Sequence, residues 1–315
     1  MPYLITLIIF LAFFFFMLRG IQRAESSFGA NTAELDEQLL AQTRSYRDAL
    51  GDVPEAAVHC LVFLDGTKGL NIDNIARQMS LQDEMFHNYR VASEGELKKQ
   101  IVIHGASLSP RIKLEIVKNP AFQNAEPASQ LASSNYYWPQ ASEDLANSRL
   151  AILCYCEEAG RTLDQSIFLS FLLQTVFSMK INASGAIWNS RQAISAQTMA
   201  DEFKVVSKSL PSHFWVAVDT YVDEDDQVCG FTEGLEDYGK TEFEAVAAPE
   251  NPLELRRRLE GYTSYALDGC AELMNGDTIG GDRQEKIKLQ KTPSKLGLPG
   301  WVFRMDYLKE SDDQP

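Results

Sequence analysis

The chain has 315 residues, of which 45% are hydrophobic, 23% charged and 10% aromatic. This composition is typical of a globular protein and excludes collagen-like, low-complexity and wholly disordered chains. The chain has 44 acidic and 29 basic residues, so its formal net charge is −15. Nucleic acid is not an expected partner of so acidic a protein.

The N-terminus begins with an apolar run, residues 2–18, that contains no charge. As a helix this run would be about 26 Å long, which is close to the hydrocarbon thickness of a bilayer, about 30 Å. A cleaved signal peptide is the main alternative, but the sequence lacks both the basic segment and the small-residue cleavage site that it requires. We therefore predict an uncleaved single-pass anchor at 1–24. Its bilayer and flanking residues are Tyr3, Phe13, Phe16, Arg19 and Arg23.

The positive charges predict the orientation of this anchor. Arg19 and Arg23 follow the apolar run directly, whereas only the α-amino group precedes it. This distribution predicts a protein of the bacterial inner membrane whose remaining chain faces the cytoplasm. The five cysteines are odd in number and most lie in apolar segments, so we expect reduced core residues and no disulfide framework.

Residues 25–52 are predicted to form a juxtamembrane helix and linker, and residues 53–158 a first α+β half. Four strands are expected in this half, and helices at 71–82 and 140–147 separate them. The expected strands are 56–64, 99–104, 111–118 and 150–156. The order β-α-β-β-α-β is typical of a ferredoxin-like layer.

Residues 159–308 are predicted to form a second α+β half. A capping box at Thr162 opens a helix that runs to about 179, and a short strand at 186–188 follows it. Ser195 caps the next helix. Strands at 214–222 and 228–231 then meet at an acidic hairpin, for which a solvated turn is favoured over a calcium site.

Asn251 and Pro252 open a long helix whose apolar stripe continues to Leu273. Strands at 286–289 and 301–307 follow this helix, and the tail 309–315 is expected to be disordered. The predicted fold class is thus α+β, with two ferredoxin-like or related layers of mainly antiparallel sheet behind one transmembrane helix.

The chain contains no recognisable catalytic motif, and no cofactor or metal is expected. Three segments are nevertheless rich in polar and aromatic groups. Residues 135–139 hold Tyr136, Tyr137 and Trp138; residues 275–282 form a glycine-rich loop with Asp277; residues 292–301 end at Trp301. The plainer interpretations are core capping, a tight turn and a buried strand face, and both interpretations stay open.

These segments also carry a resemblance. Four segments of the chain resemble the bacterial family called domain of unknown function 4261. They are the residues from Asn135 to Pro139, the helix around Gly261 and Tyr262, the Asn-Gly-Asp-Thr-Ile-Gly element that ends at Gly280, and the Leu-Pro-Gly-Trp-Val-Phe-Arg element that ends at Arg304. The resemblance covers roughly 114–308 and is most specific from Gly230 onward. It implies a bacterial α+β protein, and it supplies no activity or catalytic residues.

Two functions follow as hypotheses. The first is a membrane-tethered, non-catalytic interaction module that binds a protein partner, for which the acidic hairpin at 223–226 is a candidate surface. The second is a ligand-binding protein or enzyme with a pocket between the two halves. The candidate residues of that pocket are Tyr136, Tyr137, Trp138, Tyr262 and Asp277, and Trp301 is a further candidate for partner contact.

Overall fold

The computed structural model describes residues 43–65, 70–82, 89–93, 97–103, 110–119, 136–157, 161–179, 181–202, 211–269, 272–280 and 286–307. The predicted anchor at 1–24 and the tail at 309–315 lie outside these ranges. Of the helices that the structure describes, none combines the length and the apolar character needed to cross a bilayer. The described chain is α+β with two mainly antiparallel sheets, which confirms the predicted class.

The first sheet has eight strands in the described ranges, in the order β3-β4-β5-β6-β2-β7-β8, and β1 pairs with β5. Its strands are β1 (Arg44–Ser45), β2 (His59–Leu64), β3 (Tyr89–Ser93), β4 (Lys98–Ile103), β5 (Arg111–Lys118), β6 (Leu150–Glu157), β7 (Ala183–Trp188) and β8 (Gln192–Ser195). All of these pairs are antiparallel except β1 with β5.

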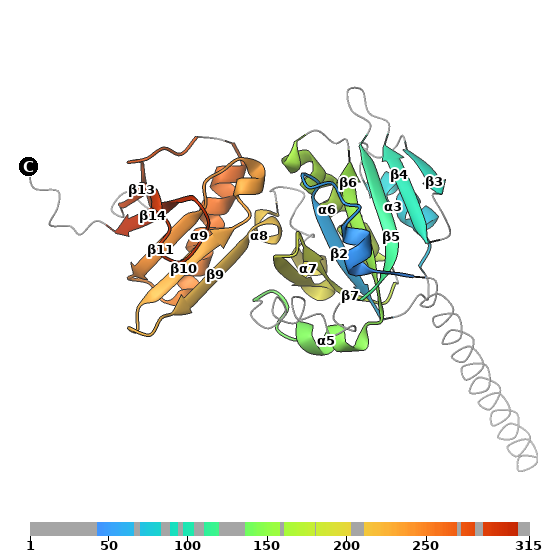
Figure 1. Cartoon of the computed structure of the whole chain (residues 1–315), viewed down its shortest axis with the longest axis horizontal. Coiled ribbons are helices and arrows are strands. Elements are labelled where there is room, and N and C mark those ends of the chain that lie inside the picture. Colours follow the sequence, from blue (N-terminus) through green and yellow to red (C-terminus); the bar gives the residue numbers. More distant parts are fainter. Residues whose placement is uncertain are drawn as a thin grey trace, which may run out of the picture.

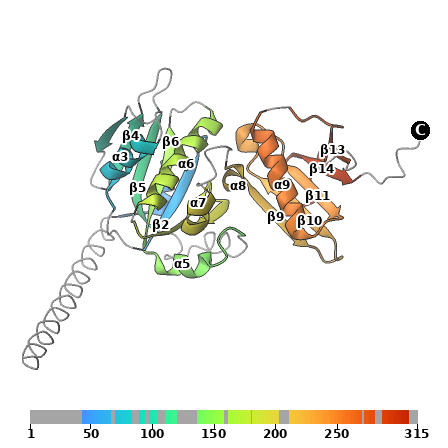
Figure 2. The same cartoon turned by 180° about the vertical axis from the view of Figure 1, so that it is seen from behind.

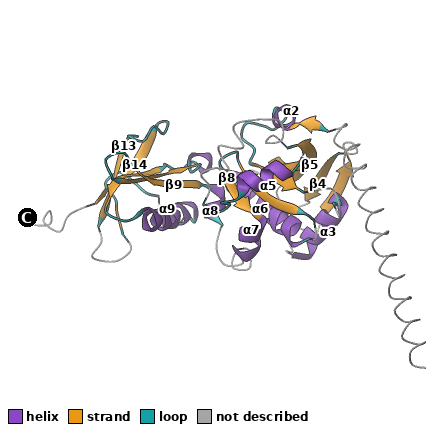
Figure 3. Ribbon diagram, turned by 90° about the horizontal axis from the view of Figure 1, so that it is seen from below, coloured by secondary structure: helices purple, strands orange, loops and turns teal. Residues whose placement is uncertain are grey.

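Helices cover both faces of this sheet. On one face, α6 (Thr162–Ser178) packs Leu169 and Leu172 into the same core as Val62 of β2. On the other face, α5 (Ala141–Asn147) packs Leu145 against Phe63. The remaining helices of this part are α2 (Tyr46–Leu50), α3 (Ile72–Gln82) and α7 (Ala196–Glu202), and Figure 3 shows α2 on the face opposite α3 and α7. Burial on both faces explains why β2 and β6 are uninterrupted apolar runs.

The ferredoxin-like arrangement predicted for the first half is wrong in two respects. In that arrangement the first strand lies beside the third and both helices cover one face. Here β6 lies between β2 and β5, and α3 and α5 are on opposite faces. An unpredicted strand, β3, follows α3 and pairs antiparallel with β4, so β4 and β5 run opposite to their expected directions relative to β2.

The second sheet has six strands in the described ranges, in the order β12-β13-β14-β11-β10-β9. Its strands are β9 (Ala217–Val222), β10 (Val228–Glu233), β11 (Phe243–Ala248), β12 (Thr278–Ile279), β13 (Ile287–Pro293) and β14 (Trp301–Tyr307). The helix α9 (Pro252–Leu267) lies across one face of this sheet, as Figure 2 shows. A Cβ added to Gly230 would lie 3.0 Å from Leu255 of α9, so this glycine allows the close approach of helix and strand.

The change from one sheet to the other falls between β8 and β9 (Figure 1). The sequence predicted the helix α6 and the strands β7 and β8 as part of a second half that begins at 159. In the structure β7 and β8 are strands of the first sheet, and α6 packs on that sheet. We call residues 43–202 the first unit and residues 211–307 the second unit. Two local predictions also differ from the structure: Phe214 lies in a short helix, α8 (Ser212–Trp215), and α9 ends at Leu267, well before Leu273.

The four cysteines within the described ranges are reduced core residues, as expected from the sequence. Cys60, Cys154, Cys156 and Cys229 are buried and carry free thiols. Burial raises the pKa of the Cys156 thiol to about 12, so this group is protonated at neutral pH and serves as a core residue.

Candidate functional site

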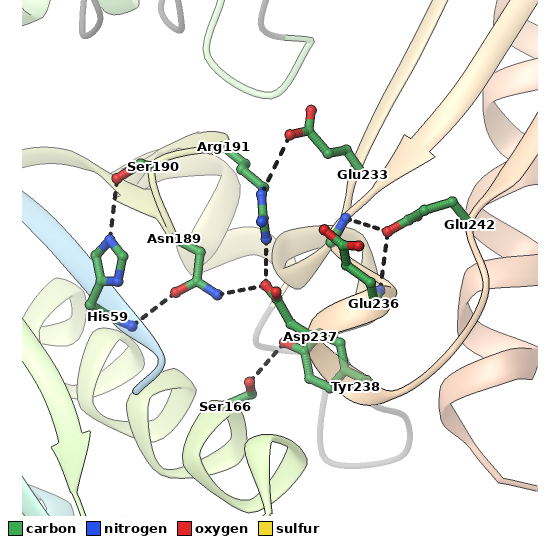
Figure 4. A network of polar contacts seen from close by, with 11 residues as sticks. His59, Ser166, Asn189, Ser190, Arg191, Glu233, Glu236, Asp237, Tyr238 and Glu242 are labelled. Atoms are coloured by element: carbon green, nitrogen blue, oxygen red, sulfur yellow. Dashed lines mark hydrogen bonds and ion pairs between the residues drawn. The ribbon is translucent and has the colours of Figure 1, made fainter. Parts of the chain in front are cut away.

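A cavity of about 390 Å³ lies where the two units meet, and we call it the junction cavity. One wall is the segment from Leu50 to His59, which leads into β2. The opposite wall consists of Asn189 and Arg191 from the turn between β7 and β8, and of Asp237 from the 3₁₀ helix η4 (Glu236–Tyr238) of the second unit. Figure 4 shows how the polar side chains of this wall converge.

The turn between β7 and β8 is held against β2 by its backbone. The Asn189 amide donates to the His59 carbonyl at 2.9 Å, and the Asn189 side-chain oxygen accepts from the His59 amide at 2.9 Å. Asn189 and Ser190 have φ angles of +44° and +57°, which lie in the left-handed region. Two consecutive residues other than glycine in this region are uncommon, and such backbone is often found at ligand sites.

His59 presents a neutral ring to the cavity. Burial lowers the pKa of this imidazole, and the Arg191 charge lowers it further, whereas a hydrogen bond to the Ala57 backbone raises it in part. The His59 Nε2 atom lies 3.2 Å from the Ser190 hydroxyl. This pair has the elements of a nucleophile and a base, but a backbone group rather than a carboxylate orients the ring.

Arg191 joins the two units across the cavity wall. Its Nη1 forms a short ion pair with the Asp237 Oδ2, and its Nε lies 3.5 Å from a Glu233 carboxylate oxygen. Asn189 donates a second bond to the Asp237 Oδ2 at 3.2 Å. Burial lowers the pKa of the Arg191 guanidinium, but Asp237 and Glu233 outweigh it and raise the value, so the guanidinium is charged.

Aromatic packing beside the cavity fixes the second unit on α6. The Trp215 indole donates to the Ser170 hydroxyl at 2.8 Å, and the Tyr238 and Ser166 hydroxyls are 2.8 Å apart. The ring of Trp215 stacks between Trp188 and Tyr238, with centroid distances of 6.4 and 6.0 Å. These contacts connect the two units beside the cavity.

The structure brings Tyr136 and Tyr137 to the junction but away from the cavity. The Tyr137 hydroxyl donates to Glu260 of α9 at 2.7 Å, and the Arg256 guanidinium lies 5.0 Å from the centre of the Tyr136 ring. Trp138 is instead part of the first core, where it is 1% exposed and donates to Asp144. The core-capping interpretation thus describes Trp138, whereas the two tyrosines connect the units.

The other predicted residues do not converge with these. Tyr262 packs against Phe243 beneath the second sheet, with ring centroids 5.8 Å apart. The Asp277 carboxylate accepts from the Met274 amide at 2.7 Å and so closes its own turn. Trp301 is 61% exposed at the start of β14. None of the six predicted residues lines the junction cavity.

The acidic hairpin is a self-contained turn. Asp223 accepts hydrogen bonds from the amides of Asp225 and Gln227, at 3.0 and 2.8 Å, so its carboxylate supports the loop. Within the described ranges, no three His, Cys, Asp or Glu side chains lie close enough together to hold a metal ion.

Sequence reasoning missed His59, Asn189, Arg191 and Asp237 as a group. They come from β2, the β7–β8 turn and η4, so no spacing in the sequence joins them. The only local signal is the Asn189-Ser190 pair, since both residues favour turns.

A family model described as "Domain of unknown function (DUF4261)" matches residues 231–305. No match to the chain is found among curated proteins or among solved structures. The matched region begins in β10 and ends in β14. It contains Asp237, which lines the junction cavity, and Glu233, which pairs with Arg191 beside it.

The structure explains one sequence element inside the matched region. Glu244 of β11 accepts hydrogen bonds from the Ser294 hydroxyl at 2.5 Å, from the Leu296 amide at 3.0 Å and from the Arg304 guanidinium at 2.9 Å. This carboxylate therefore holds the loop between β13 and β14, which contains the Leu-Pro-Gly sequence.

Proposed function

We propose that this protein is a non-catalytic ligand-binding protein whose site is the junction cavity. The observation that carries the proposal is the convergence of polar groups from both units, Asn189 and Arg191 from the first and Asp237 from the second, on one preformed cavity. Ligand sites form preferentially at such junctions, and a few placed polar groups on apolar walls fix the ligand's orientation.

The proposal is tested by binding of a fluorinated fragment set, followed by fluorine NMR, to the protein and to one variant that fills the cavity. Ala56 is exposed and lines the cavity, so Ala56→Trp is expected to abolish binding without unfolding the chain. Ala200→Trp is the matched control, because Ala200 is exposed on α7 and does not line the cavity. Fragments that bind both variants equally, or no bound fragment at all, would contradict the proposal.

The location of the protein is part of the same proposal. The apolar run at 2–18 and the arginines that follow it support an inner-membrane anchor with the two units on the cytoplasmic side.

A second candidate function is binding of a basic protein partner by the acidic hairpin. Two observations favour it: Glu224 and Asp225 are exposed, and Tyr221 and Val222 beside them are 40% and 52% exposed. Reversing both acids to lysine should abolish copurification of such a partner, whereas Asp223 must be kept because it supports the turn. An unchanged set of copurifying proteins would remove this surface from the account.

A further inference from the structure

A second cavity, of about 180 Å³, lies within the second unit, and we call it the small cavity. Its walls come from the chain between η4 and β11, from the end of α9 and the residues that follow this helix, and from β13 and β14. All of its lining residues lie inside the region that the family model matches, 231–305. None of them lines the junction cavity.

The apolar part of the small cavity is fixed by the core of the second unit. Phe243 of β11 and Phe303 of β14 are buried, and their ring centroids are 6.2 Å apart. Ala266 of α9 and Leu273 pack in the same core. Because core side chains are close-packed, this wall keeps its shape whether or not the cavity is occupied.

Two lysines bring positive charge to the small cavity. Lys240 lies between η4 and β11, and Lys291 is a residue of β13. Within the described ranges, no carboxylate pairs with either ammonium group, and the Lys291 Nζ instead lies 5.8 Å from the centre of the Phe303 ring. Two like charges that share a cavity repel each other, and an anion between them removes this repulsion.

One acid also lines the small cavity. Glu272 is exposed and, in the part of the chain that the structure describes, forms no ion pair with Lys240 or Lys291. Two ammonium groups and one carboxylate leave the lining with a charge of +1. This local charge is opposite in sign to the net charge of the chain, −15, so the lining favours an anion and Glu272 weakens the attraction.

The size of the small cavity limits the ligand to a small ion. Its volume of about 180 Å³ is below the range for organic ligands, about 300–1,000 Å³. Thr241 also lines the cavity, and its hydroxyl is a neutral donor beside the two ammonium groups. A phosphate group carries about −1.5 to −2 charges at pH 7 and offers several acceptor oxygens, so it matches two ammonium groups and a hydroxyl.

We infer that the small cavity is a binding site for a small oxyanion of the phosphate class, held by Lys240 and Lys291. The anion is either free phosphate or the phosphate group of a small ester, since both present the same charged oxygens. The inference does not depend on the proposed function, because the two cavities share no residue.

The inference is tested with the full chain carrying labelled methyl groups. Titration with sodium phosphate at pH 7 should shift the methyl resonances of Ala266 and Leu273 until they saturate, whereas sodium chloride at equal ionic strength should not. Acetate, which has one negative charge, should bind at least about threefold more weakly. Methyl phosphate distinguishes the sources: tighter binding than inorganic phosphate assigns an ester, and weaker binding assigns the free ion.

Substitutions of the charged residues should change phosphate binding in opposite directions. Lys240→Gln and Lys291→Gln should each weaken it by about fivefold, because each removes one positive charge. Glu272→Gln should tighten it by about threefold, because it removes the opposing charge. Lys288→Gln is the matched control, since Lys288 is an exposed lysine of β13 that does not line the cavity, and it should leave binding unchanged.

Two results would overturn the inference. The first is that the resonances of Ala266 and Leu273 do not shift with phosphate. The second is that Lys288→Gln weakens binding as much as Lys291→Gln does, because phosphate would then be attracted to positive charge in general. Ala56→Trp fills the junction cavity and should leave phosphate binding unchanged, so this inference and the proposed function can fail separately.

Discussion

The pKa values of two nearby carboxylates, Glu242 and Glu244, are shifted in opposite directions by their surroundings. Burial raises the pKa of Glu242, and hydrogen bonds from Thr232 and the backbone of 234–236 offset this only in part. Burial acts in the same direction on Glu244, but the hydrogen bonds from Ser294, Leu296 and Arg304 outweigh it and lower the pKa. Only the second carboxylate is stabilised in its charged form by the fold.

Glu244→Gln should therefore destabilise the protein by about 3 kcal/mol, because one acceptor oxygen is replaced by a donor and Arg304 loses its ion pair. Because the folded pKa lies below the ordinary value of 4.5, the stabilisation is complete above pH 4.5 and is lost as the pH falls through the folded pKa. Urea unfolding from pH 7 to pH 3 should show the difference between protein and variant shrinking in acid. Glu224→Gln in the exposed hairpin is the control, with an expected change under about 0.5 kcal/mol.

Gly185 should not tolerate a side chain. A Cβ at this position would lie 2.5 Å from the Ile194 carbonyl oxygen and 2.5 Å from the Trp138 ring. Gly185→Ala should cost about 2 kcal/mol by overpacking, as measured by chemical unfolding. Gly261→Ala on α9, where nothing lies within 4 Å, should instead stabilise the protein by about 0.5–1 kcal/mol. Equal effects of the two substitutions would contradict this packing.

At the scale of the element, the hydrogen bond of Tyr137 connects the segment before α5 to α9. Tyr137→Phe should lower the free energy of unfolding by about 1.5 kcal/mol, because the half-buried Glu260 loses a donor. Tyr265→Phe is the control on the same helix, since Tyr265 is 43% exposed. If thermal unfolding shows the same small change for both, the contact between the units does not contribute to stability.

The elements that the sequence predicted correctly have strong local signals. Asn251 caps α9 by accepting from the Glu254 amide at 3.0 Å, and Ser195 accepts from the Thr198 amide at 3.0 Å. The apolar runs of β2 and β6 were also clear. In contrast, the Thr162 capping box does not form, because α6 begins at Thr162 itself and has no side-chain cap.

Other element boundaries depend on tertiary context. Leu273 continues the apolar periodicity of α9, but the helix stops after Leu267, and Gly269 adopts a φ of +68°. Periodicity marks which residues are buried, and it does not require one continuous helix to bury them. The sequence thus predicted the start of α9 and not its end.

At the scale of the whole molecule, the sequence predicted two mainly antiparallel sheets but not their composition. β7 and β8 join the first sheet through the pairing of β7 with β2, a contact over more than 100 residues of chain. The residues of the candidate site were equally hard to predict, since the walls of the cavity come from segments far apart in the sequence. A pocket between two halves could be expected, whereas its residues could not be identified from local patterns.

The anchor makes a separate prediction at this scale. The full chain should sediment with membranes and resist extraction by alkaline carbonate, because residues 2–18 carry no charge. A chain without residues 1–24 should remain in the soluble fraction. Release of the full chain by carbonate would contradict the proposed location.

The most direct test of the account is to locate the bound ligand. In a protein with labelled methyl groups, a fluorinated fragment that binds should shift the methyl resonances of Leu50, Val53 and Ala57, which line the junction cavity. The methyl resonances of Val302 and Leu289 in the second sheet should not move. Shifts confined to residues outside the cavity would contradict the claim that it is the ligand site of this protein.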